Sequence, residues 1–167
     1  MTYDASIMPQ QIQNLIANLP NSNNLKPFNI LLVGPTGTGK TTTALKIAEV
    51  MNAELLEVKL KHGRADLSYL DRISTFGSTN SLGWIDTGDF TKRPKVVLVD
   101  EIDLVPTQGI PLRRTLDDQK SKIFFIATCN SIEKLHESVI SRFQVIKVEG
   151  EDLRQKFSHN QIKALLG

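Results

Sequence analysis

The sequence predicts an α/β fold, a three-layer sandwich in which a mostly parallel five-stranded sheet lies between layers of helices. Apolar runs without polar alternation, such as KVVLV at residues 95–99 and IFFIA at residues 123–127, indicate strands that are covered on both faces. These runs alternate along the chain with segments of helical periodicity, which is typical of mostly parallel sheets. At 167 residues and 40% hydrophobic content, the chain is long enough to bury one substantial core.

The first half of the chain provides two strands and three helices of this fold. Residues 8–19 have apolar side chains at helical spacing and predict an amphipathic helix before the first strand at residues 30–33. A second helix follows that strand, because Ala44, Ile47, Ala48 and Met51 recur at intervals of three and four residues. The pattern then predicts a strand at residues 53–60.

A short helix and a loop complete this half. Leu67, Leu70 and Ile73 predict a helix that ends at Gly77. Residues 78–94 are polar and rich in turn residues, so we expect a long surface loop there.

The second half of the chain again alternates strands with helices. Strands are expected at residues 95–99, 123–127 and 144–148, and they are separated by two helices. Pro111 opens the first of these helices, and residues 132–140 hold the second.

Composition excludes several other classes of protein. Twenty basic and eighteen acidic residues give a net charge of +2, which does not by itself indicate a polyanion partner. The single cysteine, Cys129, cannot form an internal disulfide, and the three histidines lie too far apart for a Cys/His metal site. We therefore expect a reducing, cytoplasmic environment. The sequence contains neither a signal-peptide pattern nor an apolar run that approaches eighteen residues, so no membrane partner is expected.

The strongest functional signal is the glycine-rich segment after the first strand. Residues 28–43 read FNILLVGPTGTGKTTT and match G-x-x-x-x-G-K-[ST] at every defined position. Glycines allow successive backbone N–H groups to point into one concavity, and the following helix directs its positive end to the same place. The segment predicts a P-loop NTPase site for ATP, in which Lys40 reaches the β- and γ-phosphates and Thr41 is a ligand of Mg²⁺. The expected ATP-binding residues are Gly34, Pro35, Thr36, Gly37, Thr38, Gly39, Lys40, Thr41 and Thr42.

Two acidic residues follow the strand at residues 95–99. Asp100 would hold Mg²⁺ through water, and Glu101 would orient and deprotonate the attacking water. The alternative is that the two acids only cap a turn. Ligands of parallel sheets bind beyond the carboxyl ends of the strands, so we expect this pair, the glycine-rich segment and Asn130 along one edge.

These motifs together resemble those of AAA+ ATPases. The segments GPTGTGKTT, VVLVDEID and IFFIATCN and the triplet SRF at residues 141–143 follow the order of Walker A, Walker B, sensor 1 and arginine finger. The resemblance covers residues 28–148 and implies a P-loop NTPase fold of AAA+ type. It implies that Asn130 touches the γ-phosphate or the attacking water, although Thr128 is a weaker candidate and a turn-forming asparagine is the alternative.

The resemblance also assigns a role to Arg142. It implies that Arg142 acts in trans as an arginine finger in the nucleotide site of a neighbouring subunit, where such a residue raises the rate by orders of magnitude. The alternative is an arginine at the surface or in a salt bridge.

Within the superfamily, PLRRTLD at residues 111–117 is similar to the clamp-loader (replication factor C-like) branch. That similarity implies that Arg113 and Arg114 contact DNA, although two adjacent arginines on a solvated helix are the alternative. The partners implied are neighbouring AAA+ subunits in a ring or spiral, DNA, and a sliding clamp or other replication protein. A helicase loader, an initiator, another remodelling ATPase and an assembly module with little hydrolysis of its own remain alternatives.

The domain organisation is expected to be simple. We predict an ATPase core with its N-terminal helix at residues 1–150 and a helical extension at residues 151–167. AAA+ proteins carry a three-helix lid after the core, and the extension would form the start of one at most, so the lid is expected to be missing or truncated.

Overall fold

The computed structural model describes residue 14 and residues 27–59, 67–79 and 93–148. The helix predicted at residues 8–19 lies outside these residues except at Asn14, which is helical. The loop predicted at residues 78–94 is described only at its ends, and the extension predicted at residues 151–167 lies wholly outside.

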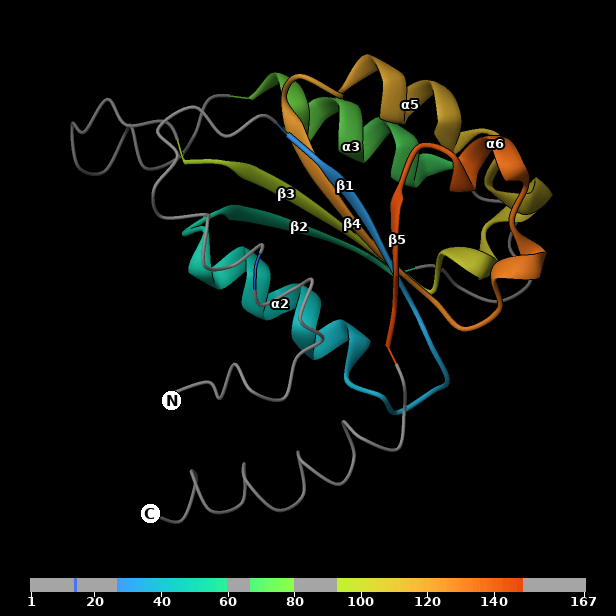
Figure 1. Ribbon diagram of the computed structural model, residues 1–167. Coiled ribbons are helices and arrows are strands. Elements are labelled where there is room, and N and C mark those ends of the chain that lie inside the picture. The colour runs from blue at the N-terminus through green and yellow to red at the C-terminus, as the bar shows by residue number, and fades with distance from the viewer. Residues whose placement is uncertain (1–13, 15–26, 60–66, 80–92, 149–167) are drawn as a thin grey trace, which may run out of the picture.

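The core of the molecule is a five-stranded sheet in which every neighbouring pair of strands is parallel (Figure 1). The strand order is β2-β3-β4-β1-β5, so β4 lies at the centre between the strands that end in the acidic pair and in the glycine-rich loop. The strands are β1 (Asn29–Val33), β2 (Glu54–Lys59), β3 (Lys95–Asp100), β4 (Ile123–Cys129) and β5 (Gln144–Lys147). The predicted α/β fold is confirmed, and the sheet is wholly rather than mostly parallel.

Helices cover both faces of the sheet. Helix α2 (Lys40–Val50) lies on one face, and α3 (Ser68–Ser78), α5 (Leu112–Asp118) and α6 (Glu137–Ile140) lie on the other (Figure 1). Alternate strand residues point to opposite faces. Ile30 therefore packs with Ile47 of α2, whereas Leu31 packs in the second cluster with Leu116 of α5.

Two predicted helices have different limits in the structure. Gly77 does not end α3, which continues to Ser78. A Cβ atom at Gly77 would lie 2.2 Å from Oε1 of Gln119, so the glycine provides space for close packing. The helix predicted at residues 132–140 is divided into a 3-10 turn, Ile132–Lys134, and α6, because the chain is extended at Leu135, whose side chain turns inward and is buried.

The connection between β3 and α5 was not predicted. It consists of two 3-10 turns, Ile102–Leu104 and Pro106–Gly109. Thr107 and Gln108 have φ angles of 55° and 56°, in the left-handed region that non-glycine residues rarely adopt.

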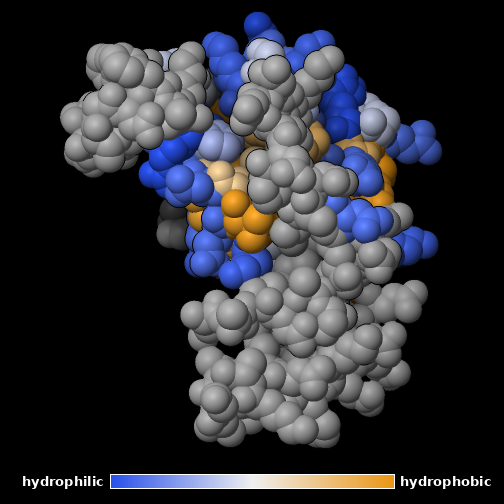
Figure 2. All heavy atoms as spheres, turned by 60° about the vertical axis from the view of Figure 1, so that its left-hand side comes forward, coloured by the Kyte–Doolittle hydropathy of each residue, from blue (hydrophilic) through white to orange (hydrophobic). Residues whose placement is uncertain are grey.

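The visible surface of the described residues is mostly hydrophilic, with a hydrophobic area within it (Figure 2). Large hydrophobic residues that are exposed in the described part of the chain are Val50, Leu55 and Leu67. None of the described helices combines the length and the apolar character that crossing a membrane would require.

Candidate nucleotide site

The ends of three adjacent strands form one edge of the sheet. The glycine-rich loop follows β1, the acidic pair stands at the end of β3, and Asn130 follows β4. Hydrogen bonds connect these ends, because Gly34 N donates to the Cys129 carbonyl at 3.1 Å and Glu101 N donates to Thr128 Oγ1 at 2.9 Å. The structure thus brings together Lys40, Thr41, Asp100, Glu101 and Asn130 from segments separated by up to ninety positions in the sequence.

Gly39 and Gly34 show why the conformation of the loop requires glycine. Gly39, directly before α2, has a φ of 83°, which an L-residue with a side chain rarely adopts. Gly34 lies so close to the strand end beside it that a Cβ atom would come within 2.3 Å of the Val148 carbonyl oxygen. The buried Thr38 hydroxyl donates to the Pro35 carbonyl at 2.9 Å and closes the loop internally.

Lys40 begins α2, and its side chain is folded back along the loop. Its Nζ donates to the carbonyl oxygens of Gly34 and Pro35, both at 2.7 Å. Burial lowers the pKa of Lys40 below its ordinary value, and nearby acidic groups, Asp103 foremost, oppose that shift. The ammonium group therefore stands in the concavity of the loop.

Asp103 is a buried acid that the sequence reasoning did not assign. It is 8% exposed, and its Oδ1 has no hydrogen-bond partner among the described residues. An unpaired buried oxygen of this kind is unfavourable without a nearby positive charge, and Lys40 supplies one. We find no comparable use for the neighbouring Cys129, because burial raises the pKa of its thiol to about 12 and keeps it protonated.

Thr41 and Asp100 form a donor set that suits Mg²⁺. The Thr41 hydroxyl donates to Asp100 Oδ1 at 2.8 Å, so its hydrogen is used there and its lone pairs are left for a cation. Mg²⁺ is usually bound by one or two carboxylates together with substrate phosphates. Among the described residues no group of three or more His, Cys, Asp and Glu side chains could hold a metal. The pair fits an ion that arrives with a nucleotide.

Glu101 and Asn130 are the exposed members of the edge. Glu101 has φ and ψ angles of 54° and 55°, a left-handed conformation that turns the chain sharply after β3. At this turn Glu101 is accessible to solvent. Asn130 is exposed immediately after the buried Cys129.

Thr128, considered in the sequence analysis only as a weaker alternative to Asn130, contacts both acids of the edge. It is 1% exposed, and its hydroxyl donates to Asp100 Oδ1 at 2.6 Å while it accepts the hydrogen of Glu101 N. It thus binds the two acids of its own chain, a role that the sequence analysis did not consider. The signal was present, since a hydroxyl interrupts the apolar run of β4, but only the register pairing Val99 with Ala127 places Thr128 beside Asp100.

Arg142 lies at the opposite edge of the sheet. Asn29 Nδ2 donates to the Arg142 carbonyl at 3.1 Å, and Asn29 begins the strand whose other end leads into the glycine-rich loop. A strand rises about 3.3 Å per residue, so the two ends of β1 are about 13 Å apart. The Arg142 backbone is therefore held far from the phosphate loop of its own chain.

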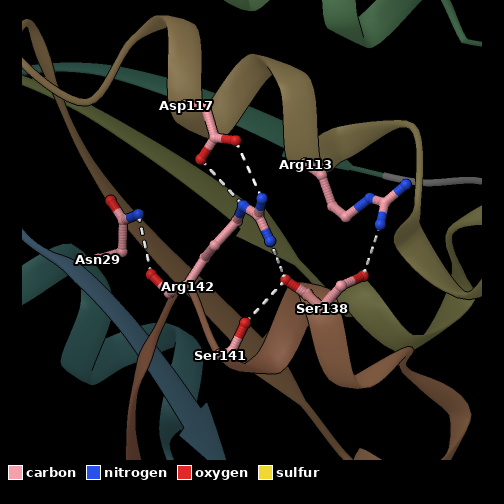
Figure 3. A network of polar contacts seen from close by, with 6 residues as sticks. All are labelled: Asn29, Arg113, Asp117, Ser138, Ser141 and Arg142. Carbon is pink, nitrogen blue, oxygen red and sulfur yellow. Dashed lines mark hydrogen bonds and ion pairs between the residues drawn. The ribbon is translucent and has the colours of Figure 1, made fainter.

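The Arg142 side chain is paired within the chain (Figure 3). Its Nε and Nη2 donate to the two carboxylate oxygens of Asp117 at 2.9 and 3.0 Å, and Nη1 donates to the Ser138 carbonyl. The hydrogen bond from Arg142 lowers the pKa of Asp117. The Arg142 side chain is still 31% exposed, so solvent reaches part of it.

The two arginines of α5 differ in their surroundings. Arg113 Nη1 donates to the Ser138 hydroxyl at 3.0 Å, which connects it to the same network as Arg142 (Figure 3). The Arg114 side chain is 92% exposed and lies 3.7 Å from an Asp118 carboxylate oxygen. Asp117 and Ser138 were not expected in any functional network, because nothing in the sequence pairs α5 with α6.

Comparison with known proteins agrees with this geometry. Residues 30–150 match the family described as ATPase family associated with various cellular activities (AAA). The chain is 28% identical over 159 residues to replication factor C subunit 3 of Oryza sativa subsp. japonica, which covers 90% of the chain and 42% of that protein. It is also 28% identical over 169 residues to a Lon protease of Leptospira interrogans, with 89% of the chain and 20% of the protease covered. The chain thus spans less than half of these relatives.

Solved structures share the fold at lower sequence identity. A DNA polymerase III gamma subunit-related protein of Thermotoga maritima matches with a TM-score of 0.64 and 14% identity, covering 83% of this chain and 46% of that one. The RuvB Holliday junction branch migration motor of the same organism matches with a TM-score of 0.56 and 18% identity, covering 86% and 45%. These two similarities concern the fold alone.

Proposed function

The chain belongs to the ATPase family associated with various cellular activities (AAA), an enzyme class, and from this premise we propose that it binds ATP with Mg²⁺ and hydrolyses it as a clamp-loader type core. The observation that carries this proposal is the hydrogen bond of 2.8 Å between Thr41 and Asp100. It joins the phosphate loop to the acidic strand end, which is the arrangement that ATP hydrolysis needs.

Each residue of the edge has a separate task. The loop N–H groups and Lys40 bind the phosphates, and Thr41 and Asp100 hold the metal. Mg²⁺, when bound with ATP, would neutralise charge on the β- and γ-phosphates. Glu101, exposed beside them, orients a water molecule and accepts its proton, and Asn130 positions the γ-phosphate or that water.

The first experiment measures ATP binding and turnover by the chain with and without Mg²⁺. Tight Mg²⁺-dependent binding together with turnover supports the proposal. Binding with negligible turnover by every assembled form would instead favour a nucleotide-dependent assembly module with little hydrolysis of its own. Absence of any ATP binding would refute both.

Arg142 acts on the nucleotide of a neighbouring subunit. Its position at the far edge of the sheet supports this role, because the strand between Asn29 and the loop keeps it from its own phosphate site. A neighbour's γ-phosphate competes with the Asp117 carboxylate for the same guanidinium donors. Assembly in a ring or spiral would therefore complete each site from two subunits.

The clamp-loader assignment is supported by the sequence relatives, which include replication factor C subunits. Arg114, and Arg113 after release from Ser138, would contact DNA phosphates, with a sliding clamp or other replication protein as a further partner. The protein would then work on DNA in the cytoplasm, in association with the nucleoid.

A remodelling ATPase, helicase loader or initiator is the second candidate. The chain is as similar in sequence to a Lon protease as to the replication factor C subunit, at 28% identity in each case. This similarity favours an AAA+ ATPase that is not restricted to clamp loading. ATPase stimulation separates the candidates: a clamp-loader core responds to primed DNA with a sliding clamp, a helicase loader or initiator to single-stranded DNA, and a remodelling ATPase to a protein partner. The clamp-loader assignment is wrong if primed DNA with a clamp has no effect.

A further inference from the structure

The central strand β4 contributes a hydroxyl group to the acidic edge. Thr128 lies one residue before the end of β4, between β3 and β1, and its side chain is 1% exposed. A hydroxyl group has one hydrogen and two acceptor lone pairs. In Thr128 the hydrogen is donated to Asp100 Oδ1 at 2.6 Å, and a lone pair accepts Glu101 N–H at 2.9 Å.

The bond to Asp100 fixes the direction of its carboxylate. Oδ1 accepts hydrogens from both Thr41 and Thr128, which leaves Oδ2 outside this pair of hydrogen bonds. Two hydroxyl groups that donate to one oxygen restrict the rotation of the whole carboxylate group. Groups that orient a metal-binding carboxylate in this way influence its affinity for the ion.

The bond to Glu101 stabilises an unusual backbone conformation. Glu101 has a φ of 54°, and a non-glycine residue remains in the left-handed region only when its surroundings hold it there. The Thr128 hydroxyl accepts the N–H of this residue and is one such restraint. The direction in which Glu101 leaves the strand therefore depends on the same oxygen atom that orients Asp100.

We propose that Thr128 is a positioning residue for hydrolysis, whose single hydroxyl sets the carboxylate of Asp100 and the turn of Glu101 together. This inference rests on the proposed ATPase function and adds a residue to it. Thr128 does not touch the nucleotide, and it acts through the two acids. Asn130 follows directly after β4. A displacement of this strand end would therefore change the positions of both acids through the Thr128 hydroxyl group.

The test replaces Thr128 with valine, which has nearly the same shape and lacks the hydroxyl. The affinity for ATP is measured with a fluorescent ATP analogue in Mg²⁺ and again in EDTA. Removal of a group that orients a metal ligand typically lowers metal affinity or activity by about 10- to 100-fold. We expect Thr128→Val to lose most of the gain in affinity that Mg²⁺ gives, while the affinity in EDTA stays within about twofold and kcat falls by about 10-fold or more.

Two control variants separate positioning from a general effect on the fold. Thr128→Ser keeps the hydroxyl and should retain the Mg²⁺ dependence. Thr115→Val removes another buried threonine hydroxyl, in α5 and away from this edge, and should leave ATP binding unchanged. If Thr128→Val does not fold, as judged by circular dichroism, Thr128→Ala is measured in its place.

The outcomes distinguish this inference from the function on which it rests. If the unmodified chain binds ATP with a clear Mg²⁺ dependence and neither hydroxyl-free variant changes that dependence or kcat, the role of Thr128 is refuted and the ATPase proposal stands. If Thr128→Ser fails to the same extent as Thr128→Val, shape rather than the hydroxyl matters, and the inference is again refuted. Absence of ATP binding by the unmodified chain overturns both.

Discussion

The two edges of the sheet fix their polar side chains in different ways. At the carboxyl edge, Asp100 is held by hydroxyl groups from the helix after β1 and from β4, and Thr128 is fully buried. At the amino edge, Arg142 is held by the exposed carboxylate of Asp117 and by a backbone carbonyl of the four-residue helix α6. The site around Asp100 is thus part of the sheet, and the site around Arg142 lies at its surface.

This difference agrees with the roles proposed for the two sites. Residues that act on the nucleotide of their own chain gain from a fixed geometry, because positioning that is complete before the reaction needs no reorganisation during it. A residue that acts on a neighbour must remain accessible and must be able to exchange its partner. Exposed ion pairs are weak and sensitive to salt, so the pair of Arg142 and Asp117 can open when a phosphate competes for it.

The largest expected effect concerns the carboxyl edge. Glu101→Gln removes the base and keeps the size of the side chain, so kcat should fall by up to about 10⁴-fold, as expected for loss of a general base, while ATP binding remains. Steady-state turnover and equilibrium binding of ATP measure the two effects separately. Lys40→Ala should instead lose ATP binding. Glu133→Gln, an exposed acid of the turn before α6, serves as the control; equal turnover in Glu101→Gln and this control would remove Glu101 from the mechanism.

The second prediction concerns the amino edge and depends on assembly. Arg142→Ala should lower turnover about 10³-fold in the assembled protein, within the range given for arginine fingers, and should leave ATP binding by the single chain unchanged. Lys134→Ala, which removes another exposed positive charge, should have little effect.

Mixing two inactive variants tests whether Arg142 acts in trans. In an assembly of Arg142→Ala and Glu101→Gln chains, some sites combine an intact Glu101 with an intact arginine from the neighbour, so part of the activity should return. If mixing restores nothing while the assemblies form normally, Arg142 acts within its own chain or has only a structural role.

The third prediction tests how rigid the carboxyl edge is. Gly34→Ala places a Cβ atom 2.3 Å from the Val148 carbonyl oxygen, and because that atom belongs to the backbone, the strand ends must move apart. Overpacking of this kind typically lowers the free energy of unfolding by about 1–3 kcal/mol. Gly77→Ala is a matched comparison, because its closest contact is the end of the flexible Gln119 side chain, which can move. Thermal unfolding should show the larger loss for Gly34→Ala, and the opposite order would contradict the rigidity of this edge.

The smallest expected effect is a change in titration at the amino edge. The hydrogen bond from Arg142 lowers the pKa of Asp117, so this pair contributes stability above the ordinary pKa of an aspartate and loses it as the pH falls through the lowered pKa. In Arg142→Ala the pKa of Asp117 should rise toward its ordinary value. NMR titration of the carboxyl carbon measures this shift, and an unchanged pKa would show that the two side chains are not paired in solution.

Local patterns made much of the carboxyl edge predictable. The strand ends at Asp100 and Cys129 could be placed within two residues because apolar runs mark buried strands, and the glycine-rich loop has a complete motif. The helix limits were less predictable. Gly77 was interpreted as a stop, whereas tertiary packing against Gln119 explains its small size, and a buried Leu135 divided the helix expected at residues 132–140.

The sequence by itself therefore determined the α/β class, the phosphate loop and the acidic pair, because each depends on neighbours along the chain. Only the tertiary structure decided which side chains restrain these groups. Thr128 meets Asp100 across 28 positions, and Asp117 meets Arg142 across 25 positions. Such pairs arise from strand register and from the packing of α5 against α6. No local sequence pattern predicts either of these, because both depend on how the whole core packs.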